Sequence, residues 1–383
     1  MGKSLMVGNT SGKATKGKNA FIGDASGKAR KIKKMWFGDA SGKARLFFSG
    51  GKELSYIGTA TALSAGKTYA AAVSIGDYAL IGGGFSYSSG STYHTTVDAY
   101  NKSLTKSSAT ALGLGRRCFS ATSVGNYAIF GGGENGGSVY TNIDVYDKSL
   151  VKQSSVTALS VARRHLASAS VGNYALFGGG AKGSTQYATV DAYDASLTRT
   201  DVEALSYKRS QLTAISFGGY ALFAGGDATR SEVDAYDASL TRTTVTALSV
   251  GRSNLASATV GNYVLFGGGL YSTSSSYNST VDVYDKSLTR TTTTNLSVGR
   301  WGLSGASIDG YALFAGGSST TSTVSNVIDV FDEALTMTTT SLSLARAALS
   351  SVTLGDYVLF CGGGTGTASS SSYYSVVDAY KVG

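Results

Sequence analysis

The chain has 383 residues with no proline, 51 glycines, two cysteines and a net charge of +9. No apolar run approaches the roughly 20 residues that a membrane helix needs, and the first residues contain no apolar stretch of the roughly 7 to 15 residues typical of a secretory signal. These features exclude a helical membrane protein and predict that no signal peptide directs export.

The positive charge is concentrated at the N-terminal end of the chain. Residues 1–52 hold twelve Lys or Arg residues against Asp24 and Asp39, a net charge of +10, whereas residues 53–383 carry a net charge of −1. The basic cluster from Lys28 to Lys34 could contact phosphates, but aromatic residues are not interleaved with it as on a platform for single-stranded nucleic acid. Nucleic acid is therefore the weaker interpretation of this charge.

Residues 1–52 form a first domain, a basic arm built of three short units with a period of 15 residues. The units cover 6–14, 21–29 and 36–44, and in each an apolar pair precedes a Gly and Asn/Asp turn with another glycine four residues later. This pattern predicts a small two-stranded hairpin, which alone is only marginally stable in water. We therefore expect the arm to dock on the rest of the chain, on its copies in a homo-oligomer, or on a larger assembly.

Two of these units share the sequence Gly-Asp-Ala-Ser-Gly-Lys-Ala-Arg, at 23–30 and 38–45. They resemble short repeats in tail and baseplate-associated proteins of phages and prophages of Gram-positive bacteria. The resemblance implies that the arm binds phage structural proteins, with the chain in a virion tail or in the bacterial cytoplasm before assembly.

Residues 53–383 form a second domain of seven longer repeats. Their common motif, Gly-Asn-Tyr-Ala-Leu-Phe-Gly-Gly-Gly at 172–180, recurs with tyrosines 43 to 49 residues apart, at Tyr78, Tyr127, Tyr174, Tyr220, Tyr263, Tyr311 and Tyr357. Each repeat contains four strand-like runs, such as 254–260, 263–266, 280–284 and 291–296, and no extended helical period. Because four strands per repeat of this length are typical of a propeller blade, we predict an all-β fold, a seven-bladed β-propeller of four-stranded blades preceded by the hairpin arm.

The phase of the repeats predicts how the ring closes. A basic residue lies 11 residues before each motif tyrosine, and a leucine lies four residues before that basic residue. The first of these leucines, Leu63, ends a fourth-strand run that no first strand precedes, while the chain ends at Tyr380, just after a third-strand run. We therefore predict that residues 54–63 are the outermost strand of the last blade, which contains Tyr357 and Asp378.

The third run of every repeat carries an aspartate before an alanine or valine and an aromatic residue. Because a catalytic acid occurs once or twice in a protein, an acid in all seven copies indicates an architectural hydrogen-bonding role. These aspartates are Asp98, Asp144, Asp191, Asp234, Asp282, Asp329 and Asp378.

A double glycine followed by this acidic run resembles the kelch family of β-propellers. The chain departs from that family by lacking the usual fourth-strand tryptophan and by using Asp where Glu is common. The resemblance implies an interaction propeller, and in the kelch family the face discussed below often binds acidic peptides.

Variation in length is confined to the loop between the second and third strands. Because strands alternate in direction, this loop and the connection after the fourth strand leave the propeller on the same face. The loops carry tyrosines among Ser, Gly and Thr, as antibody paratopes do, although the same composition can merely make loops soluble. The tyrosines predicted to bind ligand are Tyr87, Tyr93, Tyr140, Tyr187, Tyr271, Tyr277, Tyr373 and Tyr374.

The recurrent basic position, Lys67 in the first repeat and an arginine in the other six, follows the fourth strand and belongs to the same face. One interpretation is that each basic group ties a strand end to a neighbouring backbone or aspartate. In the other, the groups attract the carboxylate or phosphate of acidic sugars or peptides. The arginines predicted to bind ligand are Arg116, Arg163, Arg209, Arg252, Arg300 and Arg346.

Catalysis finds little support in the sequence. The two histidines, His94 and His165, fall in different repeats, and Cys118 and Cys361 occur in no ligand spacing, so we predict no metal site, disulfide or cofactor. Copper radical oxidases built on kelch-like propellers need a richer cluster of Tyr, Cys and His. A glycosidase pair of loop carboxylates such as Glu134 and Asp227 ranks third among the functions considered.

We therefore predict a non-enzymatic binding protein, the receptor-binding protein or adhesin of a phage or phage-like particle. In this hypothesis the loop face recognises a cell-surface glycan or protein, the arm attaches the chain to its assembly, and no membrane is bound. The alternative is an intracellular kelch-type interaction propeller that binds an acidic protein or peptide through the arginines.

Overall fold

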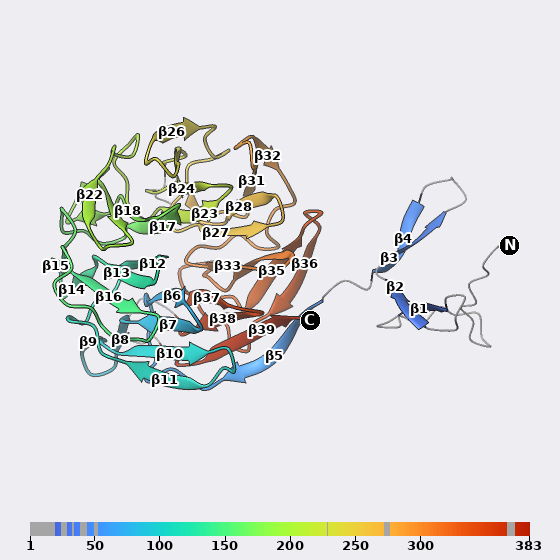
Figure 1. Ribbon diagram of the computed structural model, residues 1–383, viewed down its shortest axis with the longest axis horizontal. Helices are drawn as coiled ribbons and strands as arrows, with labels where there is room; N and C mark the ends of the chain where they lie inside the picture. Colours follow the sequence, from blue (N-terminus) through green and yellow to red (C-terminus); the bar gives the residue numbers. More distant parts are fainter. Residues whose placement is uncertain are drawn as a thin grey trace. The chain divides into compact units, whose positions relative to one another are not determined.

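A computed structural model describes residues 53–227, 229–271, 276–365 and 372–383, and of the preceding arm the backbone of four strands. The seven repeats form seven antiparallel sheets arranged as blades in a ring, which confirms the predicted seven-bladed β-propeller (Figure 1). The described residues contain no helix, and hence none long and apolar enough to cross a membrane.

Each blade has four strand positions, counted from the axis outwards. The innermost strands are β6 (Ala71–Ile75), β12 (Ser120–Val124), β17 (Ala167–Val171), β23 (Thr213–Phe217), β27 (Ala256–Val260), β33 (Ser304–Ile308) and β37 (Ser350–Leu354). The second strands are β7 (Tyr78–Gly82), β13 (Tyr127–Gly131), β18 (Tyr174–Gly178), β24 (Tyr220–Ala224), β28 (Tyr263–Gly267), β34 (Tyr311–Ala315) and β38 (Tyr357–Cys361). The third strands are β10 (Val97–Asn101), β16 (Ile143–Asp147), β21 (Val190–Asp194), β25 (Val233–Tyr236), β31 (Val281–Asp285), β35 (Val327–Asp332) and β39 (Val377–Val382). The outermost strands are β11 (Lys106–Ala109), β22 (Arg199–Asp201), β26 (Arg242–Val245), β32 (Arg290–Thr292), β36 (Met337–Ser341) and β5 (Leu54–Ala60).

The ring closes as the phase of the repeats predicts. The last sheet has the order β37-β38-β39-β5, so β5, the first propeller strand in the sequence, is the outermost strand of the last blade (Figure 1). This strand ends at Ala60 rather than at the predicted Leu63, because Leu63 turns into the core, where it is buried and its N–H donates to Ser375 O at 2.7 Å. In the second blade the outermost strand is reduced to a single bridge between Tyr146 and Lys152.

Buried tyrosines pack inside their own blade and link it to the preceding blade through their hydroxyl groups. Phe266 on β28 packs edge-on against Tyr284 on β31, with ring centroids 5.7 Å apart. The Tyr284 hydroxyl donates to the carbonyl of Thr246, in the outer part of the preceding blade, at 2.8 Å. Because both rings are fully buried, this hydrogen bond fixes one blade against the next. Equivalent hydroxyl bonds are made by Tyr100, Tyr146, Tyr193, Tyr236 and Tyr380, whereas the sixth blade has Phe331 at this position.

The glycine pair after the second strand is required by close backbone approach. Gly268 has φ +71°, and a Cβ there would lie 2.8 Å from the carbonyl oxygen of Arg300 in the next blade. Gly269 has φ +110°, and its N–H donates to that same carbonyl at 2.9 Å. These contacts explain why the motif ends in glycine. Phosphate binding is not needed to account for the glycine pair.

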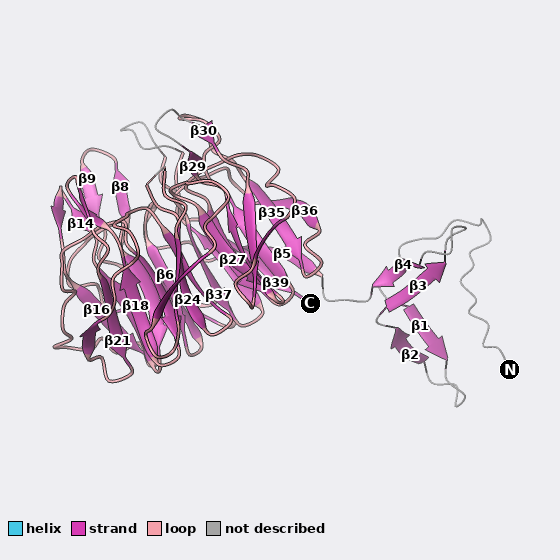
Figure 2. Cartoon of the chain, turned by 90° about the horizontal axis from the view of Figure 1, so that it is seen from above, coloured by secondary structure: helices cyan, strands magenta, loops and turns pink. Residues whose placement is uncertain are grey.

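The variable loops contain small hairpins rather than irregular chain alone. They are β8 (Phe85–Tyr87) with β9 (Ser91–Tyr93), β14 (Glu134–Asn135) with β15 (Ser138–Val139), β19 (Ala181–Lys182) with β20 (Thr185–Gln186), and β29 (Leu270–Tyr271) with β30 (Ser276–Tyr277). Their first residues also form bridges to the connection that precedes the innermost strand, as in Thr68 with Phe85 and Arg117 with Glu134. Hairpins and connections therefore share one side of the propeller, at the upper edge of Figure 2, which we call the loop face.

The arm backbone contains two hairpins. Strand β1 (Ala20–Gly23) pairs antiparallel with β2 (Ala29–Ile32), and β3 (Lys34–Gly38) pairs with β4 (Ala44–Ser49). They correspond to the second and third predicted units, and the first unit, 6–14, lies outside the described residues. The contacts divide the chain into Met1–Leu54 with Val382–Gly383, and Ser55–Lys381.

Candidate functional site

The recurrent basic residues lie inside the blades and not on the loop face. Each is fully or almost fully buried and forms an ion pair with the third-strand aspartate of its own blade, at 2.6 to 3.2 Å. In each arginine blade the guanidinium also donates to a second-strand phenylalanine carbonyl, as Arg163 does to Phe177 O at 3.0 Å. The pairs are Lys67–Asp98, Arg116–Asp144, Arg163–Asp191, Arg209–Asp234, Arg252–Asp282, Arg300–Asp329 and Arg346–Asp378.

The aspartates connect these buried cations to the outside of the blade. Asp191 also accepts from Ser160 N–H, in the connection between blades, and from Arg199 on the outermost strand at 2.7 Å. Burial alone would raise the pKa of Asp191, but Arg163 and these hydrogen bonds outweigh burial and hold the pKa below its ordinary value. This is the architectural role that the recurrence of the aspartates predicts.

This burial corrects the place of the six arginines in the predicted ligand site. Arg116, Arg163, Arg209, Arg252, Arg300 and Arg346 have no exposed surface. A surface ligand cannot contact these guanidinium groups unless the residues that bury them move, so we leave them out of the candidate site.

The eight predicted tyrosines all lie on the loop face, but the structure brings only some of them together. Tyr271 is exposed, and the other seven, including Tyr87 and Tyr277 in their hairpins, are half-buried. Tyr140, Tyr187 and Tyr374 sit at the bases of their loops, where the N–H of each donates to a glycine carbonyl at 2.8 to 3.0 Å.

Tyr93 and Tyr373 come from different blades and meet at Phe85. The ring of Phe85, nearly buried, lies 5.2 Å from Tyr93 and 5.9 Å from Tyr373, which contacts it edge-on. The Arg117 guanidinium lies 4.4 Å from the centroid of Phe85 and 5.8 Å from that of Tyr93. A cation over aromatic rings at these distances is a favourable arrangement, and it orders this corner of the loop face.

Glu134 joins Arg117 to Arg164 beside these rings. Arg117 Nε donates to Glu134 Oε1 at 2.9 Å, and Arg164 donates to the other carboxylate oxygen. Burial alone would raise the pKa of Glu134, but the two guanidinium groups outweigh burial and lower that pKa. Glu134 is 3% exposed, whereas Arg117 and Arg164 are 27% and 32% exposed. Two guanidinium groups and one carboxylate give the cluster a formal net charge of +1.

All of these groups except Tyr93 line one cavity, which we call the aromatic pocket. It has a volume of about 240 Å³ and is lined by Thr68, Tyr69, Phe85, Arg117, Cys118, Glu134, Arg164, His165 and Tyr373. Three aromatic side chains, two cations and one anion thus surround a space on the loop face where four blades meet.

A second cavity, the axial cup, adjoins the aromatic pocket at the propeller axis. It has a volume of about 310 Å³, and Tyr69, Cys118 and His165 line both cavities. One residue of each blade, two positions after the recurrent basic residue, contributes to its wall, with leucines beside them. These seven residues are Tyr69, Cys118, His165, Gln211, Asn254, Gly302 and Ala348.

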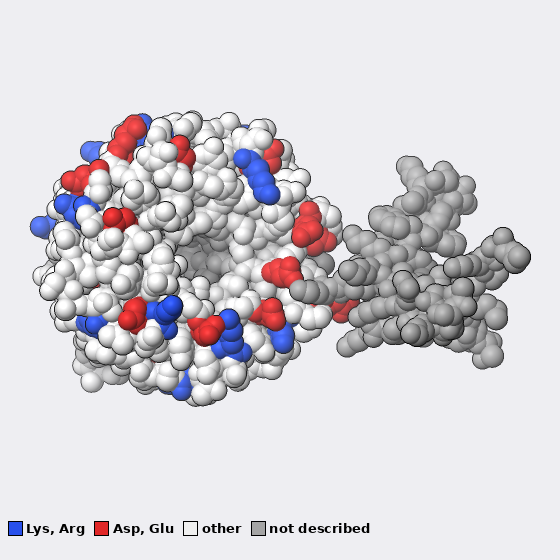
Figure 3. Space-filling view, viewed as in Figure 1, with Lys and Arg blue, Asp and Glu red and all other residues white. Residues whose placement is uncertain are grey.

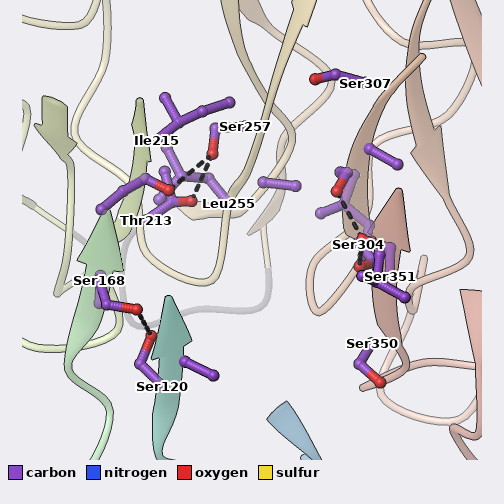
Figure 4. A pocket seen from close by; sticks show the side chains of 18 of the residues that line it. Ser120, Ser168, Thr213, Ile215, Leu255, Ser257, Ser304, Ser307, Ser350 and Ser351 are labelled. Carbon is purple, nitrogen blue, oxygen red and sulfur yellow. Dashed lines mark hydrogen bonds between the residues drawn. The ribbon is translucent and has the colours of Figure 1, made fainter. Parts of the chain in front are cut away.

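Beyond the cup a cavity of about 450 Å³ runs between the innermost strands, and the residues that line it carry no charge. Hydroxyl groups bond across neighbouring strands, as Ser120 does to Ser168 at 2.6 Å and Thr213 to Ser257 at 2.9 Å (Figure 4). Figure 3 shows the ring hollowed at its centre, with charged side chains towards its rim. The small residues of the first strand therefore serve close packing around the axis.

The residues of the aromatic pocket were only partly predictable. The predicted ligand-binding tyrosines include Tyr373, whereas the sequence does not single out Arg117 or Arg164, and it suggests Glu134 only for a glycosidase pair with Asp227. The structure gives Asp227 other partners, the N–H and hydroxyl of Ser210. The available signal was the Arg-Arg doublet, which occurs at the basic position in two of the seven repeats.

No group of three or more His, Cys, Asp or Glu side chains within the described ranges could hold a metal ion. Cys118 and Cys361 are free thiols, and burial raises the pKa of each to about 12.

Comparison with known proteins supports the fold and goes no further. No protein-family model matches the chain, and no curated protein matches it. The solved structure titled "Structure of YjhT" is similar in fold, with a TM-score of 0.58 and 13% sequence identity, over 74% of this chain and 99% of that one. The propeller fold is compatible with a binding protein.

Proposed function

We propose that the chain is a non-enzymatic binding protein that recognises a cell-surface glycan through the aromatic pocket. The observation that carries this proposal is the meeting of Phe85 and Tyr373 with the Arg117–Glu134–Arg164 cluster around one cavity. It joins an apolar surface to fixed polar groups, as small-molecule sites do.

The two halves of the pocket suit the two sides of a sugar ring. Aromatic faces pack against the C–H side of a pyranose at low entropic cost, because Tyr and Phe have few rotatable bonds. The partly exposed guanidinium N–H groups of Arg117 and Arg164 can donate to sugar hydroxyl oxygens. Since Glu134 already holds both arginines in place, these donors are ordered before a ligand arrives.

The wider role proposed is that of a receptor-binding protein of a phage or phage-like particle. The basic arm, whose repeats resemble those of phage tail proteins, would attach the propeller to its assembly, and several copies on one particle would raise avidity without new contacts. The alternative of an acidic peptide bound through the arginines is less well supported, because those groups are buried and paired with aspartates.

A printed glycan array probed with the full chain tests this proposal. We expect a restricted set of glycans to bind. Arg164→Gln should weaken binding about 10- to 100-fold, as expected for the loss of hydrogen bonds to a charged group, and Tyr373→Ala should weaken it by roughly 3- to 10-fold. Both side chains are partly exposed, so the unfolding temperature should change little.

Tyr271→Ala is the matched control, since Tyr271 is an exposed tyrosine of the same face in the fifth blade. It should leave binding unchanged. Loss of binding in Tyr271→Ala but not in the pocket variants would move the site elsewhere on the face, and an array without signal would refute glycan recognition. A chain of residues 53–383 should keep the affinity for a single glycan; if that affinity disappears, the role proposed for the arm is wrong.

A further inference from the structure

The axial cup is lined by one equivalent residue from each of the seven blades. Its seven residues occupy the same place in seven blades, two positions after the recurrent basic residue, yet all seven residues are different. The position before each of them carries the bridge to the loop hairpin in six blades, and the position after is a leucine in five blades. The side chains that line the cup therefore vary more than the residues on either side of them in the sequence.

The backbone at these positions is uniform. All seven residues have positive φ, between +51° and +61°. In six of them the N–H donates to the carbonyl of the equivalent residue in the preceding blade, as Gln211 does to His165 and Asn254 to Gln211, both at 2.9 Å. These six backbone hydrogen bonds hold the same backbone conformation at positions that carry seven different side chains.

Glycine or asparagine would suit this conformation best. For other residues the left-handed region costs about 1 kcal/mol or more. Gly302 and Asn254 meet the requirement, whereas Tyr69, Cys118, His165, Gln211 and Ala348 carry that strain. The fold alone gives no reason for a tyrosine, a histidine and a glutamine here, so these side chains point to a ligand.

The cup offers hydrogen bonds without charge. Gln211 and Asn254 supply amide donors and acceptors, Tyr69 a hydroxyl group and His165 an imidazole, while neighbouring leucines such as Leu212 supply apolar surface. Burial and the nearby Arg164 lower the pKa of His165 to about 4, so its ring is neutral at pH 7. The residues that line the cup include no Asp, Glu, Lys or Arg, and its volume lies within the roughly 300–1,000 Å³ of small-molecule sites.

We infer that the axial cup is the specificity subsite for the terminal, uncharged pyranose unit of the glycan, whose next unit lies in the aromatic pocket. Tyr69, Cys118 and His165 line both cavities, so the cavities are adjacent, and neighbouring units of one glycan would occupy them. Gly302 and Ala348 have the smallest side chains of the seven and leave room in the cup at the sixth and seventh blades. This inference rests on the proposed function and adds the class of the terminal unit and the residues that select it.

The positive φ values allow a test that spares the fold. His165→Gly and Gln211→Gly remove the cup side chains and relieve backbone strain, so both variants should unfold at the same or a higher temperature than the wild type. Ser155→Gly is the matched control, because Ser155 has φ +64° and is exposed away from the cup. Ala348→Gln adds to one blade the side chain that another blade carries at Gln211, and it should obstruct the cup.

Binding of the full chain and of each variant is measured on one array of neutral and acidic glycans. We expect neutral terminal sugars to be preferred, and His165→Gly, Gln211→Gly and Ala348→Gln to lower the signal at least tenfold or change the preferred terminal sugar, with Ser155→Gly like the wild type. If the cup variants keep the wild-type preference and signal within twofold while Arg164→Gln loses binding, the inference is wrong and the aromatic pocket stands. If the wild type binds no glycan, both proposals fail.

Discussion

The buried ion pairs allow a quantitative test of the architecture, because the sixth blade lacks a partner that the fifth blade has. In the fifth blade Asp282 pairs with Arg252 at 2.8 Å and with Arg290, on the outermost strand, at 3.0 Å. In the sixth blade Asp329 pairs with Arg300 at 2.6 Å, and among the described residues it has no second cation. Met337 stands in the sequence where the fifth blade has Arg290.

Replacing the buried arginine by methionine should therefore cost more in the sixth blade than in the fifth. Arg300→Met leaves the buried Asp329 carboxylate with one backbone donor, Ser297 N–H at 3.1 Å, and should lower the free energy of unfolding by about 3 to 5 kcal/mol. Arg252→Met leaves Asp282 with Arg290, and its cost should be about 2 kcal/mol smaller, the value of one hydrogen bond to a charged group. Arg290→Met, at a side chain that is 27% exposed, should cost about 1 kcal/mol or less.

Equilibrium urea unfolding measures the differences in unfolding free energy between these variants. The unfolding transition is followed by circular dichroism and by tryptophan fluorescence, and the free energies are compared when both signals give the same transition. The order Arg300→Met, then Arg252→Met, then Arg290→Met is expected. Equal costs for the two buried arginines, or a cost below about 1 kcal/mol for Arg300→Met, would refute the view that these ion pairs stabilise their own blades.

Two further predictions concern single positions. Phe331→Tyr should stabilise the protein by about 1 kcal/mol, since it adds to the sixth blade the hydroxyl bond that Tyr284 makes to its preceding blade at 2.8 Å. Tyr284→Phe should destabilise the protein by a similar amount. Destabilisation by Phe331→Tyr in urea unfolding would contradict the equivalence of the blades. Because the pKa of His165 falls from 6.5 to about 4 in the folded chain, the unfolded chain binds the extra proton, and stability should fall as the pH drops from 6.5 towards 4, by at most about 3 kcal/mol. His165→Asn should flatten this part of the pH profile, and an unchanged slope would show that His165 is not the titrating group.

Much of the fold was predictable because equivalent positions in the seven repeats have the same structural role. The positions of Leu63 and Tyr380 relative to the repeat period predicted that β5 closes the last blade, and the recurrent aspartates indicated architecture. The location of the six arginines was harder to predict, because the same spacing from the motif tyrosine is compatible with a surface ring and with a buried ion pair. Only the structure shows that each guanidinium turns inwards to its aspartate.

The candidate site was less predictable than the fold for a related reason. Repeat analysis draws attention to what the copies share, whereas the aromatic pocket and the axial cup depend on departures from the repeat. Arg117 and Arg164 occur at a position that holds other residues in the remaining blades, and the cup residues differ in all seven. Phe85 and Tyr373 lie far apart in the sequence, and they meet only because the ring closes.

The measurement that tests the central claim most directly is hydrogen–deuterium exchange of the full chain, with and without the glycan that binds most strongly on the array. Glycan binding at the loop face predicts slower exchange in 84–94, 115–119, 133–136 and 163–167, the backbone segments of the aromatic pocket and part of the cup. Slower exchange confined to the turns between the innermost and second strands, such as Gly76–Asp77 and Gly172–Asn173, would place the ligand on the opposite face and contradict this account.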